Sequence, residues 1–131
     1  MPEAEILTDR SVKTIREMEE AARRLCEMGC ASALVKGGHL KDNAMDILYD
    51  GKQIYRIPGK KIMTKNTHGT GCTISSAIAV MLARGFSLEE AAEKSKRYVT
   101  GAIQRADSDP VGHGHGPLHH FWFYEKWGQM E

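Results

Sequence analysis

A glycine-rich loop beside a cysteine is the part of this 131-residue sequence whose residue types could do chemistry. Residues 66–72 read NTHGTGC, and apolar residues at helical spacing follow. The backbone amides of Gly69, Thr70 and Gly71 at a helix start could form an anion hole, and the same position would stabilise a thiolate at Cys72. Phosphoryl transfer requires an anion-binding loop next to a potential base. A glycine turn, a helix cap and a buried cysteine are the alternative interpretation.

Three further polar residues could bind a nucleotide. Lys36 follows the apolar run 31–35 and precedes two glycines, so it could reach ATP phosphates as a point charge. A solvated lysine at a strand end is the alternative. Asn66 and Thr67 could shape the loop or touch phosphate or metal-bound water, and His68 could equally pack the loop or act as a ligand.

The cysteines and histidines do not predict a metal site. The chain has three cysteines, an odd number that forms no disulfide framework. Cys26 and Cys30 are expected to be small buried or partly buried side chains. The C-terminal histidines match no zinc spacing, and only adventitious nickel or zinc binding is expected of them; they are His113, His115, His119 and His120.

The first half of the chain must position Lys36 with a helix, a strand and a hairpin. Thr14 begins a capping box, and helical spacing continues from it to an end near Gly29. Residues 31–35 are short and apolar, as in a buried parallel strand. Asp50-Gly51 separates two further strands, 45–49 and 53–57, which predicts a hairpin.

The second half must position the loop with helices. Residues 60–63 are a candidate short strand before it. One helix follows the loop and ends at Gly85, and a second opens with a capping box at Ser87 and stops at Asp109-Pro110. Residues 120–127 predict a short aromatic helix. This order indicates an α/β layered domain with a parallel core strand, a hairpin and a thin sheet.

Composition excludes several classes of partner. A formal net charge of +1 gives no basic surface for nucleic acid or an anionic membrane. No apolar run approaches the roughly 20 residues that span a bilayer. The first ten residues are acidic and lack a signal peptide's pattern, so a cytoplasmic protein is expected.

Five segments together resemble the ribokinase-like superfamily, and most closely its hydroxymethylpyrimidine/phosphomethylpyrimidine kinases of thiamine biosynthesis. These segments cover essentially the whole chain and are residues 2–8, 35–39, 46–51, 66–72 and 112–117. Most of the superfamily places aspartate where this chain has Cys72, and cysteine there is typical of the pyrimidine kinases and some pyridoxal kinase-like proteins.

The resemblance implies the C-terminal part of a three-layer α/β/α fold. Residues 1–131 would be one partial domain, the nucleotide and phosphate half, without the N-terminal substrate half. Glu3 matches the glutamate of the family's Asn-x-x-Glu metal motif, whose asparagine would lie just before Met1. Glu3 would help to hold Mg²⁺ through water.

The implied activity is ATP-dependent phosphorylation of hydroxymethylpyrimidine or its phosphate, with Mg²⁺ as cofactor and Cys72 as base or orienting group. Half of a pyridoxal-type vitamin kinase is one alternative. A noncatalytic nucleotide-binding or self-associating fragment is another. A homo-oligomer or a complementary N-terminal half is expected as partner, because a missing half would leave apolar surface and a sheet edge exposed.

Overall fold

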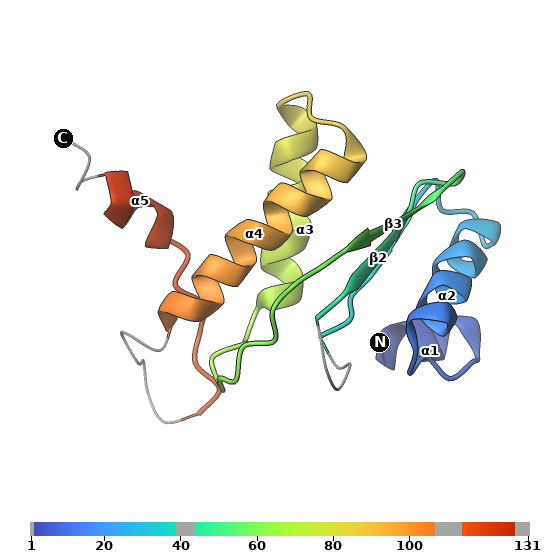
Figure 1. Ribbon diagram of the computed structural model, residues 1–131, viewed down its shortest axis with the longest axis horizontal. Helices are drawn as coiled ribbons and strands as arrows, with labels where there is room; N and C mark the ends of the chain where they lie inside the picture. The colour runs from blue at the N-terminus through green and yellow to red at the C-terminus, as the bar shows by residue number, and fades with distance from the viewer. Residues whose placement is uncertain (1, 39–43, 107–113, 128–131) are drawn as a thin grey trace. The chain divides into compact units, whose positions relative to one another are not determined.

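The computed structural model describes residues 2–38, 44–106 and 114–127, with side chains described as far as Tyr124 in the last segment. The chain divides into two compact units, Met1–Lys61 and Ile62–Glu131, which are described separately. Figure 1 labels the elements; in order they are α1 (Pro2–Thr8), α2 (Ile15–Glu27), β1 (Ala33–Val35), β2 (Asp46–Tyr49), β3 (Ile54–Ile57), α3 (Thr70–Ala83), α4 (Leu88–Ala106) and α5 (Trp122–Trp127). No helix of these described segments is long and apolar enough to cross a membrane.

The first unit contains a three-stranded sheet in the order β1-β2-β3. The predicted hairpin is confirmed: β2 and β3 are antiparallel, and the carboxylate of Asp50 accepts hydrogen bonds from the amides of Lys52 (2.8 Å) and Gln53 (2.7 Å) in the turn. Gly51 has a φ of 89°, which suits glycine.

The pairing of β1 differs from the prediction. Among the described residues β1 pairs with β2, and that ladder is antiparallel, with Ala33 opposite Tyr49. A parallel connection needs a crossover of roughly a dozen residues or more, and the segment between β1 and β2 is too short for one. The strand predicted at 60–63 is also wrong, because those residues lie in no strand.

Helix α2 covers one face of this sheet, with α1 beside it (Figure 1). Met18 and Ala22 of α2 are buried with Val35 and Ile47 of the sheet in one apolar cluster. The predicted capping box is confirmed, since Thr14 accepts from the Glu17 amide and the Glu17 carboxylate accepts from the Thr14 amide (2.8 Å). Apolar side chains at helical spacing therefore explain why α2 packs on the sheet.

The end of α2 lies close to the predicted one. Met28 caps the helix, and Gly29 follows with a φ of 119°. Cys26 is half-buried, and burial raises the pKa of its thiol. Cys30 is exposed, so the expectation of burial was wrong for it; it lies beyond the turn that ends the helix.

Helix α1 was not predicted. Thr8, buried at its end, donates a hydrogen bond to the carbonyl of Ala4 (2.6 Å). Glu5 accepts from the amide of Val12 (2.8 Å), and Val12 is itself buried. The first bond lies within α1, and the second ties α1 to the segment that leads into α2. A helix of seven residues is not stable alone, and α1 packs against α2.

The second unit is built on α3 and α4, which lie side by side (Figure 1). Gly85, with a φ of 87°, is in the turn between them, as predicted. The capping box at Ser87 is confirmed: the Ser87 amide donates to the Glu90 carboxylate (2.9 Å), and the Glu90 amide donates to the Ser87 hydroxyl (3.2 Å). The stop predicted at Asp109-Pro110 lies outside the described residues.

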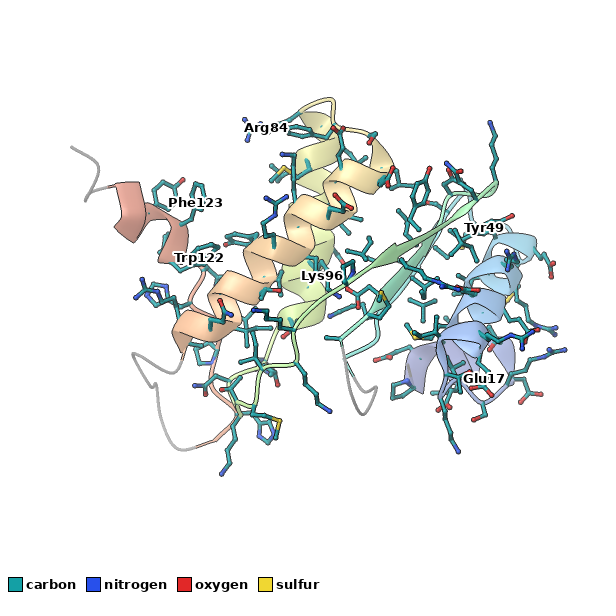
Figure 2. The ribbon with its side chains drawn as sticks, in the orientation of Figure 1. Glu17, Tyr49, Arg84, Lys96, Trp122 and Phe123 are labelled. Carbon is teal, nitrogen blue, oxygen red and sulfur yellow. The ribbon has the colours of Figure 1, made fainter. Side chains whose placement is uncertain are left out.

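The predicted aromatic helix is confirmed as α5, and its first residue anchors it to α4 (Figure 2). The indole Nε1 of Trp122 donates to the carbonyl of Tyr98 (3.0 Å), and the two rings stack with centroids 6.3 Å apart. Gly101 makes this possible, because a Cβ at that position would strike the indole ring.

Gly101→Ala should therefore destabilise the chain. Alanine favours a helix over glycine by up to about 1 kcal/mol, but overpacking against Trp122 costs about 1–3 kcal/mol. Urea unfolding followed by circular dichroism measures the net loss. Gly114→Ala, whose new Cβ would meet open space, is the matched control. Equal stabilities for the two variants would contradict the packing of Trp122 on Gly101.

The α2 capping box should also give stability that depends on pH. Hydrogen bonds from the Lys13 amide and from Thr14 hold the pKa of Glu17 below its ordinary value of 4.5. A carboxylate with a lowered folded-state pKa stabilises the fold above its unfolded pKa, and this contribution disappears as pH falls through the folded pKa.

Glu17→Gln should therefore be less stable than the parent chain at pH 7, and the difference should shrink as pH falls below 4.5. Urea unfolding of both chains over this pH range measures the difference in stability. Glu20→Gln, which removes a carboxylate at an exposed position of the same helix outside the capping box, is the control. A pH-independent difference for Glu17→Gln would contradict the assignment.

Candidate functional site

The loop before α3 makes a tight turn that ends in a left-handed glycine. Gly69 is the N-cap of α3, with a φ of 81° and a ψ of 4°. The carbonyl of Thr67 accepts from both the amide (3.3 Å) and the hydroxyl (2.6 Å) of Thr70. Glycine is favoured at position 69 because other residues adopt this backbone conformation only at a cost.

This turn leaves donors at the start of α3. The Thr70 amide is used by the turn, and the Thr73 amide donates to the Gly69 carbonyl (2.9 Å). Within the described segments, the amides of Gly69, Gly71 and Cys72 form no hydrogen bond. Unpaired N–H groups at a helix N-terminus, together with the helix dipole, form an anion-binding site. The first turn of α3 has no acidic residue to occupy it.

Cys72 lies within this first turn. Its thiol is exposed, so a substrate could reach it, as the predicted role of a base requires. The alternative of a buried cysteine is wrong. Gly71, the residue before it, is also exposed, and a Cβ added there would meet no atom within 4 Å. A small anion could therefore approach the backbone directly next to the thiol.

Asn66 connects this loop to two distant parts of the second unit. Its side-chain Nδ2 donates to the carbonyl of Ala106 (3.2 Å), and its Oδ1 accepts from the amide of Gly116 (3.1 Å). The amide of His68 donates to the Gly116 carbonyl (3.3 Å), and His68 forms an isolated parallel bridge with Pro117. The side chains of Thr67 and His68 are exposed.

A histidine contact at α3 was missed by the sequence analysis. The hydroxyl of Thr73 lies 3.0 Å from Nε2 of His120, and it also donates to the Gly69 carbonyl (2.9 Å). Thr73 and His120 are 47 positions apart, so no local pattern could have indicated the contact.

Lys36 and Glu3 lie in the first unit. Lys36 follows β1 and is half-buried. The amide of the next residue, Gly37, donates to the carboxylate of Asp46 (2.8 Å), which is 4% exposed in β2. This buried bond fixes the backbone beside Lys36. Glu3 is exposed in the first turn of α1.

The predicted site residues therefore fall into two groups. Residues 66–72 lie together in the second unit, and Lys36 and Glu3 lie in the first. Among the described residues, no group of three or more histidine, cysteine, aspartate or glutamate side chains could hold a metal ion. His113 is outside the described residues; His115 and His120 are exposed and His119 is half-buried.

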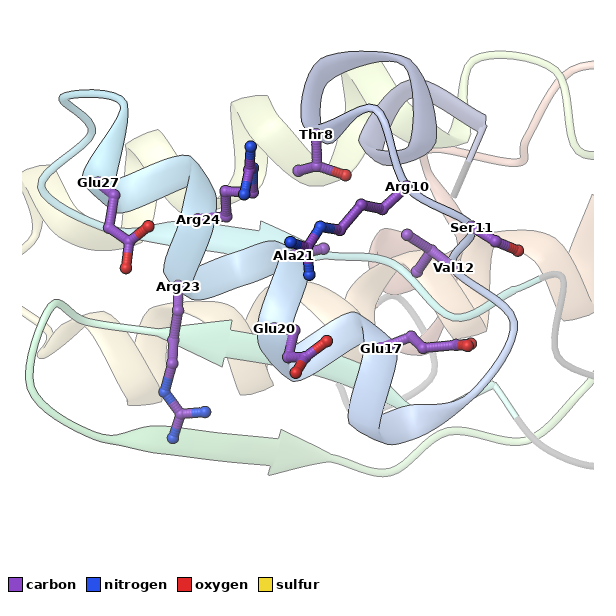
Figure 3. A pocket seen from close by; sticks show the side chains of 10 residues that line it. All are labelled: Thr8, Arg10, Ser11, Val12, Glu17, Glu20, Ala21, Arg23, Arg24 and Glu27. Carbon is purple, nitrogen blue, oxygen red and sulfur yellow. The ribbon is translucent and has the colours of Figure 1, made fainter.

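A cavity of about 200 Å³ lies in the first unit, away from Lys36 in sequence and lined by α2 and the segment before it (Figure 3). Positively charged arginine and negatively charged glutamate side chains both line it, so its charge does not favour an anion. It contains none of the predicted site residues; its lining is Thr8, Arg10, Ser11, Val12, Glu17, Glu20, Ala21, Arg23, Arg24 and Glu27.

This chain is similar to known proteins in family, sequence and structure. A family model described as phosphomethylpyrimidine kinase matches residues 1–119. The thiamine biosynthesis bifunctional protein ThiED of Geobacter sulfurreducens is 50% identical over 121 residues, which are 92% of this chain and 24% of that protein. The hydroxymethylpyrimidine/phosphomethylpyrimidine kinase of Rhizobium meliloti is 44% identical over 123 residues, 92% of this chain and 46% of that protein.

The chain also resembles solved structures of kinases. The pyridoxal kinase of Bacillus subtilis, solved as an ADP complex, superposes with a TM-score of 0.86 at 34% identity, covering 94% of this chain and 48% of that one. The chain thus spans less than half the length of each of these relatives.

Two glycine substitutions in the loop should differ in their effect on stability, because one strains the backbone and the other adds a methyl group in open space. Gly69→Ala places a Cβ at positive φ and should lower the free energy of unfolding by roughly 1–2 kcal/mol. Gly71→Ala meets no atom within 4 Å and lies in a helix, where alanine is favoured, so stability should be unchanged or slightly higher. Urea unfolding of both variants checks this; equal losses would contradict the described loop.

Proposed function

Because the chain belongs to the phosphomethylpyrimidine kinase family, we propose that it is the phosphate-binding part of an ATP-dependent kinase of thiamine biosynthesis. The acceptor would be hydroxymethylpyrimidine or its phosphate. The family and the ribokinase-like fold class agree with those expected from the sequence. The observation that carries the proposal is the set of unpaired amides at the start of α3, directly beside an exposed cysteine.

The loop would stabilise the charge of the transferring phosphoryl group. Gly69, Thr70 and Gly71 form the proposed anion hole, in which Thr70 holds the turn and the glycine amides face the anion. Fixed backbone dipoles suit this role because they need no reorganisation when charge develops. The open space at Gly71 supports a ligand approaching there.

Cys72 would act on the acceptor. As a thiolate it would accept the proton of the substrate hydroxyl, while the hydroxyl oxygen attacks the γ-phosphorus and ADP leaves with the bridging oxygen. Alternatively it orients that hydroxyl without taking the proton. Either role requires the thiol to reach the hydroxyl, and its exposure in the first turn of α3 supports this.

The remaining residues would bind ATP and Mg²⁺. Lys36 would neutralise phosphate charge, and Asn66 and Thr67 belong to the loop that meets the phosphates. Glu3 would hold Mg²⁺ through water, which fits an ion that keeps several waters and takes few carboxylates. When bound, Mg²⁺ would neutralise charge on the nucleotide phosphates. We further propose that the two units are parts of one ribokinase-like domain, in a cytoplasmic protein.

A noncatalytic role for the isolated chain is the second candidate. Helix α3 exposes Val80 and Leu82, and α1 exposes Ile6 (80%) and Leu7. Exposed apolar side chains of this kind favour association. A complementary N-terminal half or a second copy of the chain would cover them, and the chain alone would then bind nucleotide without turnover. Similarity to a pyridoxal kinase supports a pyridoxal-type acceptor as the enzymatic alternative.

The decisive experiment measures ATP consumption by the 131-residue chain with Mg²⁺ and hydroxymethylpyrimidine phosphate, with and without pyridoxal as competing acceptor. The same sample is titrated with Mg-ADP and the amides of Gly71 and Cys72 are followed by NMR. We expect those amides to shift on Mg-ADP addition. Turnover would support the kinase assignment for the chain alone, and binding without turnover would support the noncatalytic candidate.

Cys72→Ala should abolish any turnover and leave Mg-ADP binding within about twofold, because the thiol serves the acceptor. Loss of one general base costs about 10²–10⁴ in rate. Cys30→Ala, which removes another exposed thiol, is the matched control and should keep full activity. Unchanged turnover in Cys72→Ala would reject the role of the thiol, and absence of Mg-ADP binding by the parent chain would reject the phosphate site.

A further inference from the structure

We propose that Asn66 is a positioning residue, which holds the 66–72 loop in the geometry that binds phosphate through hydrogen bonds to α4 and to the C-terminal segment. This inference rests on the proposed function, since the loop must bind a nucleotide phosphate for its geometry to matter. From the sequence, Asn66 could either shape the loop or touch the ligand. We assign its side-chain amide to shaping the loop.

Both ends of the Asn66 amide are engaged within the second unit. Nδ2 donates to Ala106, 40 residues away, and Oδ1 accepts from Gly116, 50 residues away. Ala106 is the last described residue of α4, and its carbonyl accepts the bond from Asn66. Asn66 therefore joins the end of α4 to the C-terminal segment and ties the loop to both.

Gly116 fits this role for a steric reason. A Cβ at Gly116 would collide with Oδ1 of Asn66, whereas a Cβ at the nearby Gly114 would meet no atom within 4 Å. Gly116 is buried, and its own carbonyl accepts from the amide of His68. The close approach of Asn66 and Gly116 thus requires glycine at one position and a short amide at the other.

The bonds act on the donors that face the anion. His68, tied to Gly116 and Pro117, immediately precedes Gly69. Because Gly69 is the N-cap of α3, a shift of residues 66–68 would move the unpaired amides that follow. Neither Asn66 nor Gly116 has a charge, so a change in either alters phosphate binding only through geometry.

The test is a double-mutant cycle read by Mg-ADP affinity in calorimetry. Asn66→Ala removes both hydrogen bonds and leaves the Gly116 amide and the Ala106 carbonyl without the side-chain partner, so affinity should fall about tenfold. Gly116→Ala should cause a similar loss by displacing the intact amide. In Asn66→Ala/Gly116→Ala the collision is absent, so the double variant should bind no more weakly than Asn66→Ala alone.

Two controls separate this effect from general damage. Gly114→Ala adds the same methyl group where space is open, and Gln104→Ala truncates an exposed amide side chain on α4. Both should bind Mg-ADP within twofold of the parent chain. Circular dichroism and thermal unfolding are recorded for every variant, because a positioning role predicts a large change in affinity with the helical signal retained.

Each result decides the proposal. Parent-like affinity in Asn66→Ala, or losses that multiply to about a hundredfold in the double variant, would overturn it. Loss of the folded signal in Asn66→Ala would also overturn it, because the amide would then serve folding itself. Absence of Mg-ADP binding by the parent chain would instead reject the proposed function, which distinguishes the two failures.

Discussion

The structure around the loop depends on one constraint: the amide of Thr70 closes the turn on Thr67, while the amides that follow it in the first turn of α3 stay unpaired within the described segments. The left-handed backbone at Gly69 lets the chain enter the helix abruptly, and Thr70 closes the turn on Thr67. The amides of Gly71 and Cys72 are then left without partners in the described part of the chain. A helix that began with an acidic side chain would have filled this place itself.

Long-range contacts hold both groups of candidate residues. In the second unit, the loop is tied to residues 40 and 50 positions away through Asn66. In the first, the buried carboxylate of Asp46 binds the amide that follows Lys36. In each case a polar side chain bonds to backbone, which fixes the course of a glycine-containing segment that has few side chains of its own to pack. Such bonds give a defined geometry where apolar packing cannot.

What the sequence predicted correctly was local. The capping boxes at Thr14 and Ser87 and the Asp50 turn each involve residues a few positions apart, so their patterns are visible in the chain. The antiparallel pairing of β1 was missed because an apolar run does not specify its neighbour. The contacts of Asn66 were missed because its partners are 40 and 50 positions away, and the residues around it predict only a loop. The family itself was recognisable because several short motifs occur in a fixed order along the chain.

In the proposed anion site the donors are neutral amides, which explains why so much support is needed. A lysine or arginine attracts phosphate over several ångströms and tolerates small errors in position, whereas a backbone N–H must point at its acceptor at hydrogen-bond distance. The second unit presents its amide donors from a loop of glycine, threonine and histidine. The formal net charge of the chain is only +1. The proposed anion binding there would depend on geometry more than on bulk charge. An uncharged asparagine that anchors the loop strengthens that geometry and leaves the field at the anion unchanged.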